Sequence, residues 1–253
     1  MADPRSLFDL TGKIACVTGA SSGLGRQAAR ALSSAGAQVV AVARREDALT
    51  SLTGEIGKGS AYVAADVADR DHMDSLCEAI CRPFGAPDIV VHAAGVNTRQ
   101  AADDVTAEGW DQTLALNLSA PFFLSQKLVP VMKEKGWGRI VNFASLQTTR
   151  AFPGGIAYGA SKAAIAQLTR AMAEAWSPHG ITANAIGPGF FPTELTQAVF
   201  EDKKRSARNA AQTCIGRNGR LEDMDGPLLF LCSDASAYVT GQVLMVDGGF
   251  TAK

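Results

Sequence analysis

Tyr158 and Lys162 stand four residues apart in the stretch YGASK, near the start of a long run with helical spacing of apolar residues. Residues i and i+4 of a helix share one face, so the phenol and the ammonium group are predicted to be neighbours. A tyrosine with a pKa of about 10 is a poor base at neutral pH, but a nearby lysine cation lowers that pKa. Together with Ser145, which ends the preceding predicted strand, these residues indicate general acid–base chemistry.

A second chemical signal lies in residues 17–26, VTGASSGLGR, where two motifs overlap. Read from Gly19, the stretch fits G-x-S-x-G, the sharp turn that presents a nucleophilic serine in hydrolases. That reading makes Ser21 the nucleophile and requires a histidine late in the chain. The chain has three histidines and none follows residue 179, so a serine hydrolase is a minor alternative.

The same stretch also fits a glycine-rich turn that holds the phosphates of a dinucleotide between a strand and a helix. Glycines let the backbone approach the phosphates, and the helix N-terminus adds free N–H groups and partial positive charge. The spacing is G-x-x-x-G-x-G rather than G-x-G-x-x-G. The predicted phosphate-binding residues are Gly19, Ser21, Ser22, Gly23, Leu24 and Gly25.

The end of the second predicted strand, AVARRED, indicates which dinucleotide is bound. An acidic residue there would bond the free ribose hydroxyl of NAD, whereas an arginine accommodates the 2′-phosphate of NADP. Ala43 is followed by Arg44 and Arg45, whose guanidinium groups suit a phosphate. We therefore predict NADP(H) in preference to NAD(H), with Arg44 as the main contact. The alternative is that both arginines are solvated surface residues.

Composition and charge narrow the class of protein. The chain has 253 residues, of which 47% are hydrophobic and 19% charged, with a net charge of -1, so a large core is expected and a nucleic-acid partner is not. The five cysteines lack metal-ligand spacing, so we predict reduced thiols and no metal. There is no signal-peptide pattern and no apolar run of membrane-spanning length. We expect a cytoplasmic protein with no membrane contact.

Short apolar runs alternate with longer amphipathic runs along the whole chain, which is typical of βαβ units. The predicted strands cover 13–19, 37–44, 60–67, 87–95, 138–145, 181–189 and 241–249. The predicted helices cover 24–36, 45–57, 70–85, 106–136 with an irregularity near Pro121, 157–180 and 222–234. We predict one α/β domain over residues 1–253, a Rossmann fold with a doubly wound, seven-stranded parallel sheet and helices on both faces. Ligands of such sheets bind beyond the carboxyl ends of the strands.

These motifs, in this order and spacing, resemble the classical short-chain dehydrogenase/reductase family from Leu10 to Phe250. TGASSGLG resembles the family's cofactor turn, ADV its adenine-contacting stretch, HAAG its Asn-Asn-Ala-Gly segment and GPGFFPTEL its Pro-Gly segment. The resemblance implies further cofactor contacts at Asp66, Val67, Ala94, Gly95, Tyr158, Lys162, Pro188, Gly189, Phe191 and Thr193.

The resemblance also implies a mechanism. Tyr158 would exchange a proton with the substrate oxygen, Ser145 would orient that oxygen, and Lys162 would support the phenol and bond the nicotinamide ribose. Asn117 would position a water in a proton relay towards Lys162. The sequence departs from the family pattern at His92 and Ala93, where the family usually has two asparagines. We expect His92 to be a buried, hydrogen-bonded structural residue.

The resemblance also implies the substrate class, a ketone or aldehyde or the corresponding alcohol, with 3-oxoacyl thioesters and keto-sugar acids as the nearest classes within the family. Phe152 and Phe190 offer apolar walls, while Gln147 and Arg150 could meet hydroxyls or an acidic group. A lid is expected over roughly 190–217, against the alternative that its charged run is a solvated helix face. A catalytically silent NADP-binding regulator is a further alternative. The resemblance also implies a homotetramer, paired through helices around 105–135 and 155–177.

Overall fold

The computed structural model describes residues 4–253, in which the apolar runs of the sequence become the strands of one sheet. The strands are β1 (Ile14–Thr18), β2 (Gln38–Ala43), β3 (Ser60–Ala64), β4 (Ile89–His92), β5 (Gly138–Phe143), β6 (Ile181–Pro188) and β7 (Val243–Val246). Their order is β3-β2-β1-β4-β5-β6-β7 and every neighbouring pair is parallel. The predicted seven-stranded parallel sheet is confirmed.

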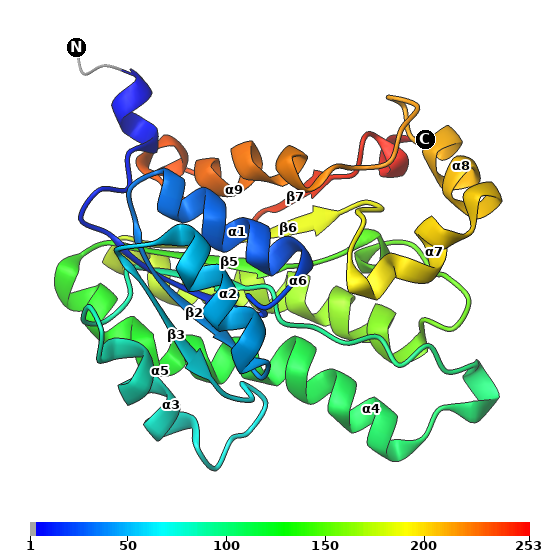
Figure 1. The fold of residues 1–253 in the computed structure, drawn as a ribbon. Helices are drawn as coiled ribbons and strands as arrows, with labels where there is room; N and C mark the ends of the chain where they lie inside the picture. The colour runs from blue at the N-terminus through cyan, green and yellow to red at the C-terminus, as the bar shows by residue number, and fades with distance from the viewer. Residues whose placement is uncertain (1–3) are drawn as a thin grey trace.

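Helices connect the strands, because parallel neighbours need a crossover connection. They are α1 (Gly23–Ser34), α2 (Glu46–Ile56), α3 (Met73–Cys81), α4 (Ala107–Leu114), α5 (Ala120–Lys135), α6 (Ile156–Trp176), α7 (Gln197–Glu201), α8 (Lys203–Gln212) and α9 (Asp225–Cys232). Ala15 and Val17 of β1 pack with α1, α2 and α9, whereas Cys16 packs with α3, α5 and α6. Figure 1 shows α1 and α9 on one side of the sheet and α3 and α5 on the other. The predicted helices on both faces of the sheet are therefore confirmed, and the inner strands β2, β1, β4, β5 and β6 are buried, whereas the edge strands β3 and β7 are half-buried.

The chain changes direction across the sheet between β3 and β4. From β1 it builds outward through β2 and β3, and it then returns so that β4 pairs with β1 on the other side. The helices that follow β1 and β4 consequently leave on opposite faces of the sheet, and a crevice opens beyond the carboxyl ends of these two strands.

The long run at 106–136, predicted as one helix with an irregularity near Pro121, is interrupted slightly earlier. A π-helical turn (Ala115–Ser119) separates α4 from α5, and Pro121 lies in the first turn of α5. Proline has no N–H to donate to the carbonyl four residues before it, here that of Asn117, which favours a wider turn at this point.

The segment 190–217, expected to be a lid or a solvated helix face, contains the short helices α7 and α8. Figure 1 shows both helices beyond the carboxyl ends of β6 and β7. Among residues 4–253 there is no helix with both the length and the apolar character needed to cross a membrane.

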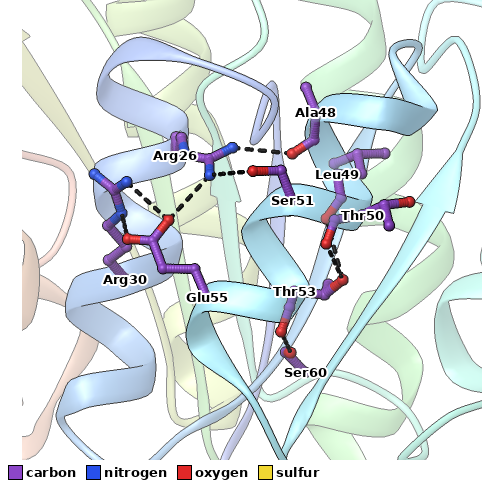
Figure 2. Close-up of polar contacts among 9 residues, drawn as sticks. All are labelled: Arg26, Arg30, Ala48, Leu49, Thr50, Ser51, Thr53, Glu55 and Ser60. Carbon is purple, nitrogen blue, oxygen red and sulfur yellow. Dashed lines mark hydrogen bonds and ion pairs between the residues drawn. The ribbon is translucent and has the colours of Figure 1, made fainter.

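A polar cluster fixes α1 against α2, as Figure 2 shows. Arg26 and Arg30 of α1 both bond the carboxylate of Glu55 in α2, with nitrogen–oxygen distances of 3.0 Å and 2.9 Å. Arg26 also donates to the carbonyl oxygen of Ala48 at 2.9 Å. Because α2 begins directly after Arg45, these contacts fix the end of β2 beside the start of α1.

His92 ends β4 and is buried, as its structural role requires. Its Nε2 atom lies 2.8 Å from the hydroxyl oxygen of Ser125 in α5, so one hydrogen bond ties the strand to the helix that covers it. Burial lowers the pKa of His92 from 6.5 to about 3, and the imidazole is therefore neutral in the folded protein.

The neutral His92 predicts a loss of stability in acid. The unfolded chain binds a proton at this residue below a pH of about 6.5, whereas the folded protein does not until the pH approaches 3. The contribution of His92 is therefore complete above pH 6.5 and declines as the pH falls, by about 2 kcal/mol between pH 7.5 and 5. Urea unfolding at several pH values should show a shallower decline for His92→Asn than for the wild type. A matched control, the exposed His179→Asn, should keep the wild-type slope, and equal slopes in all three proteins would contradict the assignment.

Candidate active site

The carboxyl ends of β1, β2, β4, β5 and β6 border a cleft of about 740 Å³. Its walls come from the segments that follow these strands and from the segment that follows β3. All the residues predicted for the cofactor line this cleft, as do Ser145, Gln147, Phe152 and Phe190. Asn117 is buried behind it, and of the residues predicted to meet the substrate only Arg150 lies outside it. The fold therefore brings together residues from six distant parts of the chain.

The glycine-rich turn forms one end of the cleft and presses against the end of β4. A Cβ atom on Gly19, whose φ is +68°, would lie 2.6 Å from the backbone nitrogen of Ala94. A Cβ atom on Gly25 would lie 2.3 Å from the carbonyl oxygen of Gly19. Ser22 is the N-cap residue of α1 and makes no side-chain capping bond, which leaves N–H groups of the first turn available to an anion. The turn therefore has the close backbone packing and the donors that a pyrophosphate needs.

Arg45 extends over the glycine-rich turn. Its Nη2 atom donates to the hydroxyl oxygens of Ser21 and Ser22 at 3.0 Å and 2.9 Å, and its Nη1 atom donates to Glu194 at 2.8 Å. The side chain of Arg44 is 71% exposed and lies 3.8 Å from the Asp66 carboxylate. The structure thus directs Arg45 towards the turn and Arg44 towards solvent, although the sequence led us to favour Arg44.

Two pairs of residues flank the middle of the cleft. Asp66 and Val67 follow β3, and Asp66 accepts a hydrogen bond from the backbone of Ala68 at 2.9 Å. Ala94 and Gly95 follow β4, and their small size keeps this wall open. These positions agree with an elongated ligand that runs from the turn to the end of β3 and along the end of β4.

The buried face of α6 carries Tyr158 and Lys162 into the cleft, as their spacing predicted. The ammonium group of Lys162 donates to the carbonyl oxygen of Phe143 at 2.6 Å and lies 5.5 Å from the centroid of the Tyr158 ring. The side chain of Ser145 acts on the pKa of the Tyr158 phenol. Ser145 begins a short 3₁₀ turn after β5 and accepts from the backbone of Gln147 at 3.1 Å. A phenol, a hydroxyl and an ammonium group therefore converge at the end of β5.

The pKa of Tyr158 differs from the sequence-based expectation. Burial raises it above its usual value, while the hydrogen bond with Ser145 and the positive charge of Arg99 oppose that rise. The ammonium group of Lys162, which we expected to act on the phenol, bonds the Phe143 carbonyl oxygen. Burial also lowers the pKa of Lys162 to about 8. The phenol is consequently protonated at neutral pH, and Lys162 is close to its point of half-protonation at mildly alkaline pH.

Asn117 lies in the π-helical turn, and its side chain faces the loop after β4. The amide nitrogen donates to the Val96 carbonyl oxygen at 2.9 Å, and the amide oxygen accepts from the Val96 nitrogen at the same distance. The amide nitrogen also donates to the hydroxyl of Ser161 in α6 at 3.0 Å. Asn117 therefore fixes the loop that carries Ala94 and Gly95 and links it to the helix that carries Tyr158.

The floor of the cleft is the end of β6 and the segment that follows. Pro188 ends the strand, and Gly189 packs so tightly that a Cβ atom there would lie 2.8 Å from the Cα atom of Asp247. Phe191 is 3% exposed, and Thr193 begins the short 3₁₀ turn Glu194–Thr196. All four predicted residues thus reach the same stretch of the cleft.

The aromatic side chains of Phe152 and Phe190 line one end of the cleft, and the buried Phe250 packs against them. Phe152 and Phe190 meet edge to face with ring centroids 6.2 Å apart, and Phe250 lies 5.8 Å from Phe190. The sequence analysis missed Phe250, because only the fold brings the end of the chain to this point. The buried Oε1 atom of Gln147 faces the same region and has no hydrogen-bond donor among residues 4–253. This end offers an apolar wall and one free acceptor.

Arg99 is a functional candidate that the sequence analysis missed. It lines the cleft, its charge acts on the Tyr158 phenol, and its guanidinium donates to the carbonyl oxygen of Leu195. Its φ is +54°, and it is the one non-glycine residue with positive φ in the described part of the chain. Strained backbone of this kind gathers at functional sites. The only sequence signal was its position shortly after the predicted strand 87–95, at the carboxyl end of the sheet where ligands bind.

Arg150 does not reach the cleft. Its guanidinium donates to the carbonyl oxygen of Lys253 at 2.6 Å on an exposed surface. The nearby Thr148 supports the site indirectly, because its hydroxyl donates to the carbonyl oxygen of Lys162 at 3.2 Å. The positive charge beside Tyr158 comes from Arg99 instead.

Comparison with known proteins places this geometry in context. A family model described as enoyl-(acyl carrier protein) reductase matches residues 19–251. The chain is 38% identical over 248 residues to gluconate 5-dehydrogenase of Gluconobacter oxydans, covering 97% of each chain. It is 34% identical over 242 residues to 3-oxoacyl-[acyl-carrier-protein] reductase of Escherichia coli, covering 96% of this chain and 98% of that one.

A solved structure agrees with these relationships. Gluconate 5-dehydrogenase from Burkholderia cenocepacia, crystallised with NADP and tartrate, superposes with a TM-score of 0.93 at 34% identity and covers 98% of both chains. Both the sequence relatives and this solved structure therefore match the chain over nearly its full length. The protein belongs to the short-chain dehydrogenase/reductase family of oxidoreductases.

Proposed function

We propose that the protein is an NADP(H)-dependent oxidoreductase that moves a hydride between nicotinamide and a carbonyl carbon or the corresponding secondary alcohol. One observation carries the proposal: Tyr158, Ser145 and Lys162 converge in the same cleft that has the phosphate-binding turn at its other end. The cleft can accordingly hold an extended dinucleotide with its reactive ring beside a proton donor.

The nicotinamide cofactor supplies or accepts the hydride when it is bound. In reduction, Tyr158 donates its proton to the substrate oxygen, and its raised pKa keeps that proton available at neutral pH. Ser145 hydrogen-bonds the same oxygen and orients it. Lys162 would bond the ribose of the bound cofactor, and with a pKa of about 8 it could pass a proton towards Tyr158. Asn117 fixes the loop beside Lys162 and is proposed to position a water in that relay.

Removing the phenolic hydroxyl should stop the reaction without preventing cofactor binding. Tyr158→Phe should lower kcat by about a hundredfold or more, because general acid catalysis typically contributes that much. The rate is followed by nicotinamide absorbance with a keto acid, and cofactor affinity by fluorescence titration. Near-normal turnover in this variant would overturn the assignment.

The preference for NADP(H) is proposed to rest mainly on Arg45. Its guanidinium lies beside Ser21 and Ser22, where a 2′-phosphate would meet a planar donor pair and two hydroxyls. Arg44 is nearby but exposed and contacts Asp66, so it is expected to contribute less.

Exchange of each arginine for alanine separates their contributions. Arg45→Ala should weaken NADPH binding by about tenfold or more, since a charged hydrogen bond is worth roughly 1.5 kcal/mol. NADH binding should change little, because NADH lacks the 2′-phosphate. Arg44→Ala is the matched comparison and should have a smaller effect in calorimetric titrations. A larger loss in Arg44→Ala would return the main role to that residue.

A keto-sugar acid is proposed as the substrate class. Arg99 places a positive charge close to Tyr158, and Gln147 offers a buried acceptor for a substrate hydroxyl. A carboxylate with neighbouring hydroxyls would satisfy both groups. The relatives named gluconate 5-dehydrogenase support the same class.

The role of Arg99 can be tested with a charged and a neutral form of one substrate. Arg99→Gln should raise KM for 5-keto-gluconate by about tenfold, the loss expected when a charged hydrogen bond becomes neutral. KM for the methyl ester, which has no carboxylate, should change much less. Arg150→Gln, which alters an arginine outside the cleft, is the control. An equal rise in KM for acid and ester would show that Arg99 does not recognise the carboxylate.

Other functions are less well supported. In the described part of the chain no histidine lines the cleft, and the Ser21 hydroxyl accepts bonds from Arg45, which does not fit a serine hydrolase. A silent regulator would not need the intact set of Tyr158, Ser145, Lys162 and Asn117. A 3-oxoacyl thioester carried by an acidic protein is a second candidate, because α8 exposes Lys203, Lys204, Arg205 and Arg208 beside the cleft. Rates with a keto acid and with a 3-oxoacyl thioester would distinguish the two substrates.

The lid and the assembly also belong to the proposal. Leu195, Thr196, Val199 and Arg205 line the cleft, which supports a covering role for residues 190–217. A homotetramer is proposed to pair through α4–α5 and α6, and Ile156, at the start of α6, is the large apolar side chain on these helices that is exposed, at 50%.

A further inference from the structure

The carboxylate of Glu194 crosses the cleft and lies on the glycine-rich turn. Its two oxygens accept from the Nη1 and Nη2 atoms of Arg45 at 2.8 Å and 2.9 Å, and one of them also accepts from the Ser22 hydroxyl at 3.0 Å. Glu194 lies in the segment that follows β6, 149 residues after Arg45 in the chain. This is a long-range contact between the proposed lid and the proposed phosphate site.

The position of this carboxylate is an anion site. It faces the planar donor pair of Arg45 and lies at the N-terminus of α1, whose first N–H groups carry partial positive charge. Ser21 and Ser22 complete the surroundings with two hydroxyls on Arg45. A phosphate monoester bound here would need the same Arg45 donors that Glu194 now uses.

Thr193, the residue before Glu194, adds a packing contact between the lid and the glycine-rich turn. A Cβ atom on Gly23 would lie 3.1 Å from the Cβ atom of Thr193, so the lid backbone before Glu194 already packs on the start of α1. The arginine and the carboxylate are both about half exposed, at 51% and 59%, so water screens the pair and the contact is weak enough to be displaced.

We propose that Glu194 sets the cofactor selectivity by competing within the chain with the 2′-phosphate of NADP(H) for Arg45. The inference rests on the proposed function. NADPH has to displace the carboxylate from the guanidinium, whereas NADH, which lacks the 2′-phosphate, does not. Glu194 therefore reduces the advantage that Arg45 gives to the phosphorylated cofactor.

The test compares fragments that differ only in the phosphate. Binding of 2′-phospho-AMP and 5′-AMP, and of NADPH and NADH, is measured by calorimetry on the whole protein. Glu194→Gln should tighten the two 2′-phosphorylated ligands by about three- to fivefold, the range of an exposed ion pair, and change the other two by less. Glu201→Gln removes an exposed carboxylate from α7 with no contact to Arg45 and should change none of them.

The double variant decides the mechanism. In an Arg45→Ala background, Glu194→Gln should have no effect on the 2′-phosphorylated ligands, because the contested group is absent. Weaker binding of 2′-phospho-AMP in Glu194→Gln, or an unchanged ratio of NADPH to NADH affinity, would overturn the proposal. Failure of the wild type to bind either dinucleotide would instead contradict the proposed function itself.

Discussion

The site depends on one buried cation. Lys162 is 5% exposed, and its ammonium group has its hydrogen bond to the carbonyl oxygen of Phe143, the last residue of β5. Removing a charge from water is costly, and the lowered pKa of Lys162 records that cost. The bond ties α6 to the end of β5, and this connection sets where Tyr158 stands relative to Ser145. A ligand that offers further acceptors to the ammonium group would relieve part of the same cost.

The region around His92 and Ala93 shows how the sheet retains its shape with unusual residues. Asparagines at these positions would bond their neighbours through side-chain amides, which Ala93 cannot do. Here the hydroxyl of Thr18 accepts from the Ala94 nitrogen at 3.3 Å, and His92 bonds Ser125 instead. The loop beyond is bonded by Asn117 through both backbone groups of Val96. The hydrogen bonds that hold this region therefore come from β1, β4, α5 and the π-helical turn, and not from one pair of asparagines.

Much of this arrangement was predictable from the sequence because it follows from local patterns. The strands were visible as apolar runs, the glycine-rich turn as a motif, and Tyr158 with Lys162 as a helical pair. What could not be predicted was the direction of individual side chains. The choice between Arg44 and Arg45 depends on how α2 starts, and the first turn of α2 is held by the contact of the Ala48 carbonyl oxygen with Arg26 of α1. Arg99 and Glu194 act across the cleft, and no spacing in the sequence relates them to their partners.

The raised pKa of Tyr158 belongs to the same class of effect. The spacing from Lys162 is correct, but spacing does not show which acceptor the ammonium group selects. Burial depends on the whole fold, and it outweighs the charges near the phenol. A sequence motif therefore identifies the residues that form a site more readily than it identifies their pKa values.

The π-helical turn at Ala115–Ser119 makes the length of this segment a determinant of activity. Each residue of an α-helix advances about 100° around the axis. Loss of one residue from this turn would restore a regular helix and rotate everything before it, Asn117 included, away from the loop after β4. Insertions and deletions are thus constrained here even though the segment reads as an ordinary helix, and natural variation in length should gather in other connections of the fold.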